Sequence, residues 1–287
     1  MARSVKTLLL ALLLGTGLAA APARALDLSD PDQSLAAFIK MRCSLASEDV
    51  VTWWKGTIFA HLPAAAPRAI LGFEGFNVCR AEKLDDGSYR FLSRELSFYR
   101  DLKTGQILER WDNPLNEQSV DVLQVANDPV NHIMGAPGRR MAFPIDRQGE
   151  DLLLTFNVPL SYPNPLPPGD WPEESSGETY TGSEHFLFFA KAKEVDDPGV
   201  DNAHITLGWT RVGPWLPWMR MGQRPGNLLY IAHGAKLGGI ADLPQDMQDE
   251  VRERYPEYAT APKQWTQPNE TSWTYYRKRM EQQRKEE

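Results

Sequence analysis

A run of β-branched and aromatic segments separated by short turns constrains the fold of this chain most. Between residues 50 and 125 these segments are VVTWWKGTIFAHL, RAILGFEGFNVCR, SYRFLSRELSFYRD, QILERW and SVDVLQV. The turns between them contain Asp, Asn, Gly or Pro, which is typical of antiparallel hairpins. Later segments of the same kind are RRMAFPI, EDLLLTFNVPL, GETYTGSEHFLFFAKAKEV and NAHITLGWTRV. We therefore predict a mainly β fold, an antiparallel meander of roughly eight to ten strands that closes into a calycin-like barrel or a barrel-like sandwich.

Helices are expected before and after this meander. In SDPDQSLAAFIKMRCS, Asp30 is a predicted N-cap, Pro31 takes the first helical position, and apolar residues follow at helical spacing. Near the other end, a short strand in NLLYIAHG precedes a helix predicted from Pro244 to Arg254. Residues 159–172 hold six prolines. Because proline cannot donate to a central ladder, this stretch is expected to be a stiff loop that covers one end of the barrel.

The first 25 residues have the pattern of a secretory signal. Arg3 and Lys6 precede an apolar stretch, and Ala23 and Ala25 are small residues suited to cleavage before Leu26. The stretch is shorter than the roughly 20 apolar residues that span a bilayer. We therefore expect a periplasmic or secreted protein with no integral membrane segment after cleavage. The expected parts are a signal peptide (1–25), a single β-rich domain (26–265) and a charged helical or frayed tail (266–287).

Charge and cysteine content exclude some classes of function. The net charge is −7, and the signal contributes three basic residues and no acidic one, so the mature chain is more acidic still. An acidic surface repels phosphate backbones, and nucleic acid is not an expected partner. Cys43 and Cys79 lack metal or redox spacing. In an oxidising compartment they could pair, or they could be separate buried residues, and the sequence leaves both open. The five histidines stand apart, so no metal or other cofactor is expected.

Two carboxylates lie within the aromatic strands. Alternation puts Glu95 and Tyr99 on one face of their strand and Arg94 on the other. This arrangement suits a polar-lined barrel interior, although cross-strand ion pairing of Glu95 or Arg94 is the alternative. Glu74 lies between two glycines, which mark either a bend in the sheet or a close approach of a ligand. Partial desolvation there would raise its pKa and suit a general acid.

The segment VANDPVNH gathers Asn127, Asp128, Asn131 and His132 around one proline. Asx side chains bond to their own backbone in such turns, which is the structural interpretation. The functional interpretation makes His132 a base that Asp128, four residues earlier, orients. No G-x-S-x-G or H-E-x-x-H motif accompanies it, so both interpretations stay open.

Aromatic residues gather near the end of the meander, where Trp209 precedes Trp215 and Trp218 in PWLPWMRMGQRPG. Tryptophan and methionine bury large areas and adapt to apolar ligands. These residues are expected to seal one end of the barrel, to form a wall of a ligand pocket, or both. Tryptophan faces also stack on sugars, which keeps carbohydrate binding open.

Five segments, taken together, resemble a known family: GFEGFNVCR, SRELSFYRDLKTGQILERWDNP, VANDPVNH, PWLPWMRMGQRPG and YPEYATAP. The family is catalogued only as domain of unknown function eighteen thirty-eight. The resemblance covers about residues 30 to 265. It implies a single domain, and an export signal is frequent among members. It brings no activity, cofactor or catalytic residue.

The leading hypothesis is an enzyme that applies acid–base chemistry to a small apolar or aromatic molecule held inside the barrel. A non-catalytic binding or carrier protein for a hydrophobic ligand is the first alternative, and a carbohydrate-binding module is the second. The residues expected to take part in catalysis are His132, Asp128, Glu95, Glu74 and Tyr99. Those expected to bind the ligand are Arg94 (its anionic group), Asn127, Asn131, Trp209, Trp215 and Trp218.

Overall fold

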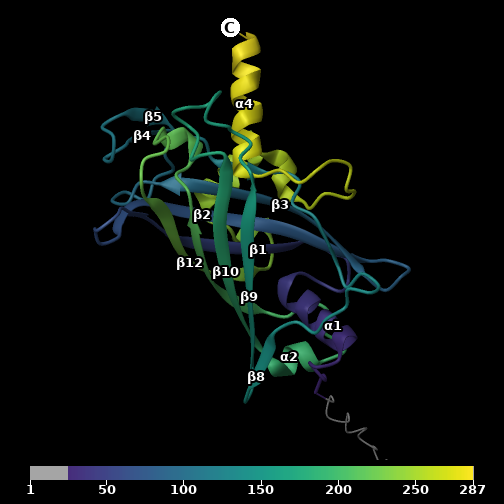
Figure 1. Ribbon diagram of the computed structural model, residues 1–287. Coiled ribbons are helices and arrows are strands. Elements are labelled where there is room, and N and C mark those ends of the chain that lie inside the picture. The colour runs from purple at the N-terminus through teal and green to yellow at the C-terminus, as the bar shows by residue number, and fades with distance from the viewer. Residues whose placement is uncertain (1–24, 287) are drawn as a thin grey trace, which may run out of the picture.

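The computed structural model describes residues 25–286, so the predicted signal peptide lies almost entirely outside the described residues. The chain forms one large antiparallel sheet with helices at both of its ends (Figure 1). Within residues 25–286, no helix combines the length and the apolar character needed to cross a membrane.

The main sheet has ten strands in the order β6-β3-β2-β1-β12-β11-β10-β9-β8, with β7 also paired to β3. Their bounds are β1 (Val50–His61), β2 (Arg68–Lys83), β3 (Tyr89–Arg100), β6 (Val125–Asn127), β7 (His132–Met134), β8 (Ile145–Gln148), β9 (Asp151–Pro163), β10 (Thr179–Lys191), β11 (Ile205–Gly213) and β12 (Asn227–Leu237). A separate small sheet pairs β4 (Arg110–Asp112) with β5 (Ser119–Asp121). The predicted antiparallel meander is confirmed, and its last strand, β12, returns to pair with its first, β1.

The sheet is open, which corrects the expectation of a closed barrel. Its two edges are formed by β6 and β7 on one side and β8 on the other, and in the described part of the chain no pairing joins them. The sheet is nevertheless strongly curved. Phe73 of β2 and Trp209 of β11 have ring centroids 5.6 Å apart, whereas three strand spacings in a flat sheet would separate them by about 14 Å. The curvature creates a concave and a convex face.

Small residues make room for this curvature. The row of opposed residues that joins Phe73 to Trp209 passes through Gly56 of β1 and Ala232 of β12. A Cβ atom added at Gly56 would lie 2.2 Å from the carbonyl oxygen of Ile231, so a larger residue cannot fit without a shift of the backbone. The large rings at either end of the row therefore meet above the small residues between them.

Helices cover the ends of the sheet and part of its convex face. α1 (Pro31–Arg42) begins as predicted, because the Asp30 side chain accepts hydrogen bonds from two backbone N–H groups of the first turn. α1 and α2 (Ala192–Asp196) lie at one end and α4 (Ser272–Glu286) lies at the other (Figure 1). α3 (Gln245–Arg254), also predicted, packs on the convex face through Met247 and Val251. Three short 3₁₀ turns complete the fold: η1 (Pro217–Met219), η2 (Ile240–Asp242) and η3 (Pro256–Ala259).

Two apolar clusters occupy the ends of the concave face. One forms where Phe38 of α1 packs with Phe188 of β10 and their neighbours. The other contains the buried rings of Trp215 and Trp218. Trp209 packs against both clusters and so marks the band between them. The polar side chains described below lie in this band.

The proline-rich stretch and the segment before it differ from the prediction. RRMAFPI is mostly irregular, since β8 begins only at Ile145. β9 continues to Pro163, because β8 pairs with only four of its residues and leaves the rest at an edge, where proline removes no ladder bond. The following loop buries Leu166 and Trp171 in the tryptophan-rich cluster.

The two cysteines form a disulfide, which decides the question that the sequence left open. Cys43 follows α1 directly and Cys79 lies on β2, with Cα atoms 6.1 Å apart. The bond therefore ties the end of α1 to the sheet.

Candidate functional site

Glu95 lies on the concave face between two asparagines. The strand register opposes it to Asn127 of β6 and to Asn77 of β2. Directly opposed residues project to the same side of a sheet, so the register also puts His132 on this face, opposite Phe91 of β3. The Oδ1 atom of Asn127 is buried and has no hydrogen-bond partner in the described part of the chain.

A second polar group approaches from the other side of the curved sheet. Glu184 of β10 opposes Arg211 of β11, with 3.6 Å between Oε1 and Nε. The other oxygen of Glu184 accepts a hydrogen bond from Trp209 Nε1 at 3.3 Å. Arg211 also donates to the Tyr180 hydroxyl, and its guanidinium lies 5.4 Å from the centroid of the Tyr230 ring. The charge of Arg211 is thus balanced by Glu184.

The pKa of Glu95 is strongly perturbed. Burial raises it to about 7, the negative charge of Glu184 acts in the same direction, and Arg211 and Arg42 act against both. Five strand spacings would separate β3 from β10 by about 24 Å in a flat sheet, so the curvature brings Glu184 into electrostatic range. Glu95 as a residue is half-buried and so is not fully enclosed. Such a group can both donate and accept a proton near neutral pH.

Arg42 adds a cation at the end of α1. Its guanidinium lies 4.7 Å from the centroid of the Phe188 ring and 5.8 Å from that of Phe186. Burial lowers its pKa to about 10, against the opposite influence of two carboxylates. The end of α1 is held by the disulfide and by Lys236, whose Nζ donates to the carbonyl oxygens of Lys40 at 2.7 Å and Cys43 at 2.8 Å.

His132 and Tyr99 are two further titratable groups on this face. Partial desolvation lowers the pKa of His132, although the residue itself is exposed, and the positive charge of Arg42 lowers it further. The imidazole is therefore neutral at neutral pH and can accept a proton. Burial raises the pKa of Tyr99 well above its usual value, so its hydroxyl stays protonated. The Tyr99 ring packs edge-on against Trp218 at a centroid distance of 5.0 Å.

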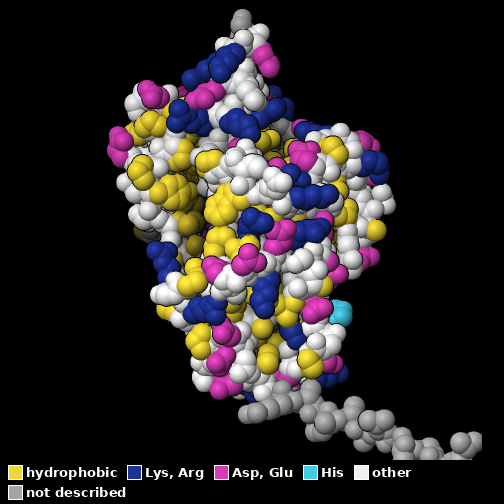
Figure 2. All heavy atoms as spheres, turned by 90° about the vertical axis from the view of Figure 1, so that its right-hand side faces the viewer, with side chains coloured by type: hydrophobic (Ala, Val, Ile, Leu, Met, Phe, Trp, Pro, Cys, Tyr) yellow, Lys and Arg dark blue, Asp and Glu magenta, His cyan; other side chains and the backbone are white. Residues whose placement is uncertain are grey.

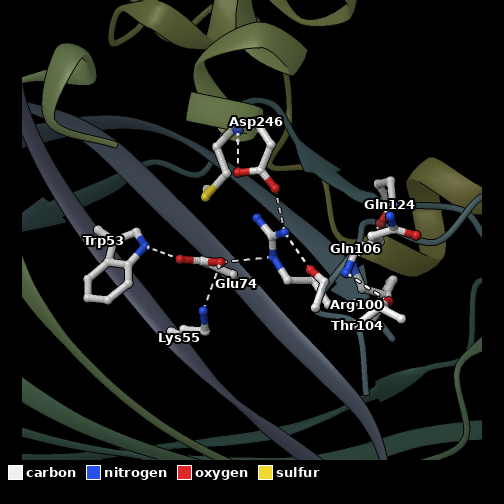
Figure 3. A network of polar contacts seen from close by, with 11 residues as sticks. Trp53, Lys55, Glu74, Arg100, Thr104, Gln106, Gln124 and Asp246 are labelled. Carbon is white, nitrogen blue, oxygen red and sulfur yellow. Dashed lines mark hydrogen bonds and ion pairs between the residues drawn. The ribbon is translucent and has the colours of Figure 1, made fainter. Parts of the chain in front are cut away.

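Glu74 lies on the convex face, in a network of polar contacts shown in Figure 3. One carboxylate oxygen is 2.8 Å from Arg100 Nε and 3.6 Å from Lys55 Nζ, and the other accepts a hydrogen bond from Trp53 Nε1 at 2.9 Å. Arg100 also pairs with Asp246 of α3 at 2.5 Å. The network fastens α3 to the sheet. The structure does not bring Glu74 together with Glu95, because the two project from opposite faces.

Asp128 and Arg94 pair with each other, with 2.9 Å between Arg94 Nε and the Asp128 carboxylate. Arg94 also donates to the carbonyl oxygens of Glu257 and Thr260, so its donors are already engaged. Within residues 25–286 no hydrogen bond joins Asp128 to His132, and the expected orienting pair does not form. Asp128 instead lines a polar hollow of about 360 Å³ beside η3 and α4.

Three further predicted residues support the fold around the site. Asn131 accepts a hydrogen bond from the backbone N–H of Ser93 at 3.1 Å and is almost fully buried. Trp215 and Trp218 are also buried and seal one end of the concave face. Of the three predicted tryptophans, Trp209 is the one that borders the polar band.

Sequence reasoning did not single out Arg42, Glu184 and Arg211. A signal for two of them was present, because Glu184 and Arg211 share the alternation of Phe186 and Trp209 on their strands. Among the described residues, no group of three or more His, Cys, Asp or Glu is placed to hold a metal ion. A surface hollow of about 510 Å³ near Thr181 and Asn227 has no ionisable lining residue and cannot itself perform acid–base chemistry.

The surface offers apolar area between its charges. On the side of the molecule shown in Figure 2, hydrophobic side chains gather in hollows of the upper half, with charged side chains of both signs around them. Accessible apolar surface with a few polar groups is what a small, largely apolar ligand requires.

Residues 47–280 match the model of a family described as protein of unknown function (DUF1838). The chain belongs to this family. A comparison with curated proteins gives no match. The region matched to DUF1838 includes every strand of the concave face, whereas α1 and Arg42 precede it.

Proposed function

We propose that this member of DUF1838 is an exported enzyme that applies acid–base chemistry to a small, largely apolar or aromatic molecule on the concave face. The observation that carries the proposal is Glu95, a half-buried residue that lies on the concave face between Asn77 and Asn127 and whose carboxyl has a pKa raised to about 7. General acid–base catalysis works best when the pKa of the group lies near the working pH. Glu95 transfers the proton, neutral His132 is a second acceptor, and Asn127 offers an unpaired amide oxygen to the substrate.

The neighbouring rings support an apolar or aromatic substrate. Phe156 and Phe186 are stacked with centroids 4.9 Å apart, and Phe186 continues toward Trp209 at 6.4 Å. Both Phe186 and Trp209 remain partly exposed, so their faces are available to a ligand. Aromatic surfaces of this kind bury a large area per contact.

The position of the charged side chains, which project onto the concave face, favours an enzyme over a carrier or a sugar-binding module. A carrier of hydrophobic molecules is expected to line its site with apolar groups, but here Glu95, Glu184 and Arg211 share the concave face. A sugar-binding surface is expected to display exposed tryptophans, whereas Trp215 and Trp218 are buried.

Two features support export as part of the proposal. The first is the signal pattern at the start of the sequence. The second is the disulfide between Cys43 and Cys79, since such bonds persist in oxidising compartments.

Proton exchange tests the proposed chemistry before the natural substrate is known. The mature protein is incubated in D₂O with a panel of small cyclic and aromatic ketones, and deuterium incorporation beside the carbonyl is followed by NMR. We expect catalysed exchange that rises as pH increases through about 7, where Glu95 becomes a base. Glu95→Gln should abolish it. Glu82→Gln, which alters a partly exposed ion pair with Arg90 on the convex face, should not. Exchange that survives in Glu95→Gln, or that no ketone of the panel shows, refutes the proposal.

A further inference from the structure

The guanidinium of Arg42 differs from those of the buried and half-buried arginines on the strands of the main sheet. Arg94, Arg100 and Arg211 each have an ion-pair partner. In the part of the chain that the structure describes, Arg42 has neither a hydrogen-bond acceptor nor an ion-pair partner for its side chain, and its contacts are with aromatic ring faces. A guanidinium carries five N–H donors, and those of the half-buried Arg42 are free to meet a ligand.

The charges on the concave face leave Arg42 unbalanced. Glu184 balances Arg211 through their direct contact. Glu95 is largely protonated below pH 7, because burial raises its pKa to about that value. His132 is neutral, and burial keeps Tyr99 and Tyr230 protonated by raising the pKa of each. Lys236, on the same face of β12, lies beside the end of α1, and burial together with the positive charge of Arg42 lowers its pKa to about 7. At or below neutral pH, the face therefore has more positive than negative charge.

The planar geometry of the Arg42 guanidinium favours one class of anion. A guanidinium is planar and binds a carboxylate through two parallel hydrogen bonds, which gives direction as well as affinity. The rings of Phe186 and Phe188 lie beside the guanidinium, so a ligand that reaches it also contacts apolar surface. A fully polar anion would leave this surface unused.

We infer that the ligand of the concave face is a small carboxylate, whose charged end pairs with Arg42 and whose apolar or aromatic body packs against Phe186 and Trp209. This inference names the substrate class of the proposed enzyme and rests on that proposed site, but it does not require turnover. It also replaces Arg94, predicted from the sequence to bind the anion, with Arg42.

The inference links ligand binding to the protonation of Glu95. A bound carboxylate adds a second negative charge near Glu95, which favours the protonated form. The groups that face Glu95 are Glu184, Arg211, Arg42 and Tyr99. Those that face Arg42 also include His132 and Lys236. Carboxylate affinity should therefore fall as pH rises above about 7, by up to about tenfold per pH unit.

Binding of a matched pair of probes tests the inference. 4-Phenylbutyrate is the carboxylate probe, and 4-phenylbutanamide is its neutral counterpart of nearly the same shape. Isothermal titration calorimetry at about pH 6 should show at least about tenfold tighter binding of the carboxylate to the mature protein. Arg42→Gln should remove this preference while leaving amide binding in place. Arg110→Gln, a change at an exposed arginine that pairs with Asp121 in the small sheet, should keep the preference.

A second measurement does not depend on whether Arg42→Gln folds. In the unmodified protein, the affinity for 4-phenylbutyrate should decrease between about pH 6 and about pH 8.5. In Glu95→Gln the decrease should be smaller, and what remains comes from Lys236, whose pKa is also about 7. Equal affinity for the two probes, no binding of the carboxylate, a preference that survives in folded Arg42→Gln, or a pH-independent affinity in the unmodified protein overturns the inference. If the preference holds but no deuterium exchange is found, the catalytic proposal fails and the carboxylate site stands.

Discussion

Replacing Glu95 with glutamine should stabilise the protein at alkaline pH. The carboxyl has a pKa of about 7 in the folded state against an ordinary value of 4.5. Between these values the folded protein holds a proton that the unfolded chain releases, so the free energy of unfolding decreases as pH rises, by about 1.4 kcal/mol per pH unit. From pH 4.5 to about pH 7, the free energy of unfolding decreases by about 3 kcal/mol. Above pH 7 this decrease persists, because the ionised carboxylate stays in surroundings that disfavour its charge.

Glutamine cannot ionise and so avoids this loss. Glu95→Gln should match the unmodified protein in stability at about pH 4.5 and exceed it by about 3 kcal/mol at about pH 8. Urea unfolding followed by tryptophan fluorescence at these two pH values measures the difference. Glu82→Gln, on the convex face, should not reproduce this pH-dependent gain. A Glu95→Gln variant that gains nothing at pH 8, or that differs from the unmodified protein by the same amount at both pH values, refutes the electrostatic account of the site.

Three further outcomes test other parts of the structure. Glu74→Ala should destabilise the protein by about 1–3 kcal/mol in urea unfolding, because Arg100 Nε and Trp53 Nε1 lose their acceptor although Asp246 still pairs with the guanidinium, and an unchanged stability would contradict the network. Replacing both Cys43 and Cys79 with alanine should cost about 4 kcal/mol for a crosslink between residues 36 positions apart, and an unchanged Tm would speak against it. Asp128→Asn should leave the NMR titration of His132 unaltered, whereas a shift in that pKa would restore the pair expected from the sequence.

Local signals in the sequence predicted much of the scaffold. Asp30 and Pro31 indicate the start of α1, and the structure has that helix with that cap. Simple alternation along β3 puts Glu95 and Tyr99 on one face, as observed. The sequence could not show that the sheet stays open. Closure into a barrel depends on pairing between distant edges, and the edge strands β6, β7 and β8 are short.

The two carboxylates of the aromatic strands show where local reasoning ends. Glu74 and Glu95 look alike in the sequence, each within a β-branched and aromatic segment. The register of β2 against β3 opposes Glu95 to Asn77 but Glu74 to Phe98, so the two glutamates point to opposite faces. A shift of one residue in pairing would exchange these faces, and a single sequence does not fix the register.

The groups that perturb Glu95 were the least accessible to prediction. Arg42 comes from a helix before the sheet, while Glu184 and Arg211 come from strands far along the chain. They meet only because the curved sheet turns β3 toward β10, and this long-range shape has no local signature. The turn that follows β6 shows the same limit, because Asp128 was assigned to His132 by proximity in sequence but pairs with Arg94.

Cys43 follows Arg42 directly, so the crosslink to β2 holds the residue next to the cation that we assign to ligand recognition. Oxidation of the two thiols would then contribute to ligand recognition by Arg42 as well as to folding. In a chain that remains reduced, the packing of α1, the Lys236 contacts and the hydrogen bonds from Lys40 Nζ to the carbonyl oxygens of Val195 and Asp197 still hold the helix end. If the protein is exported as we propose, an oxidising compartment would complete the binding surface.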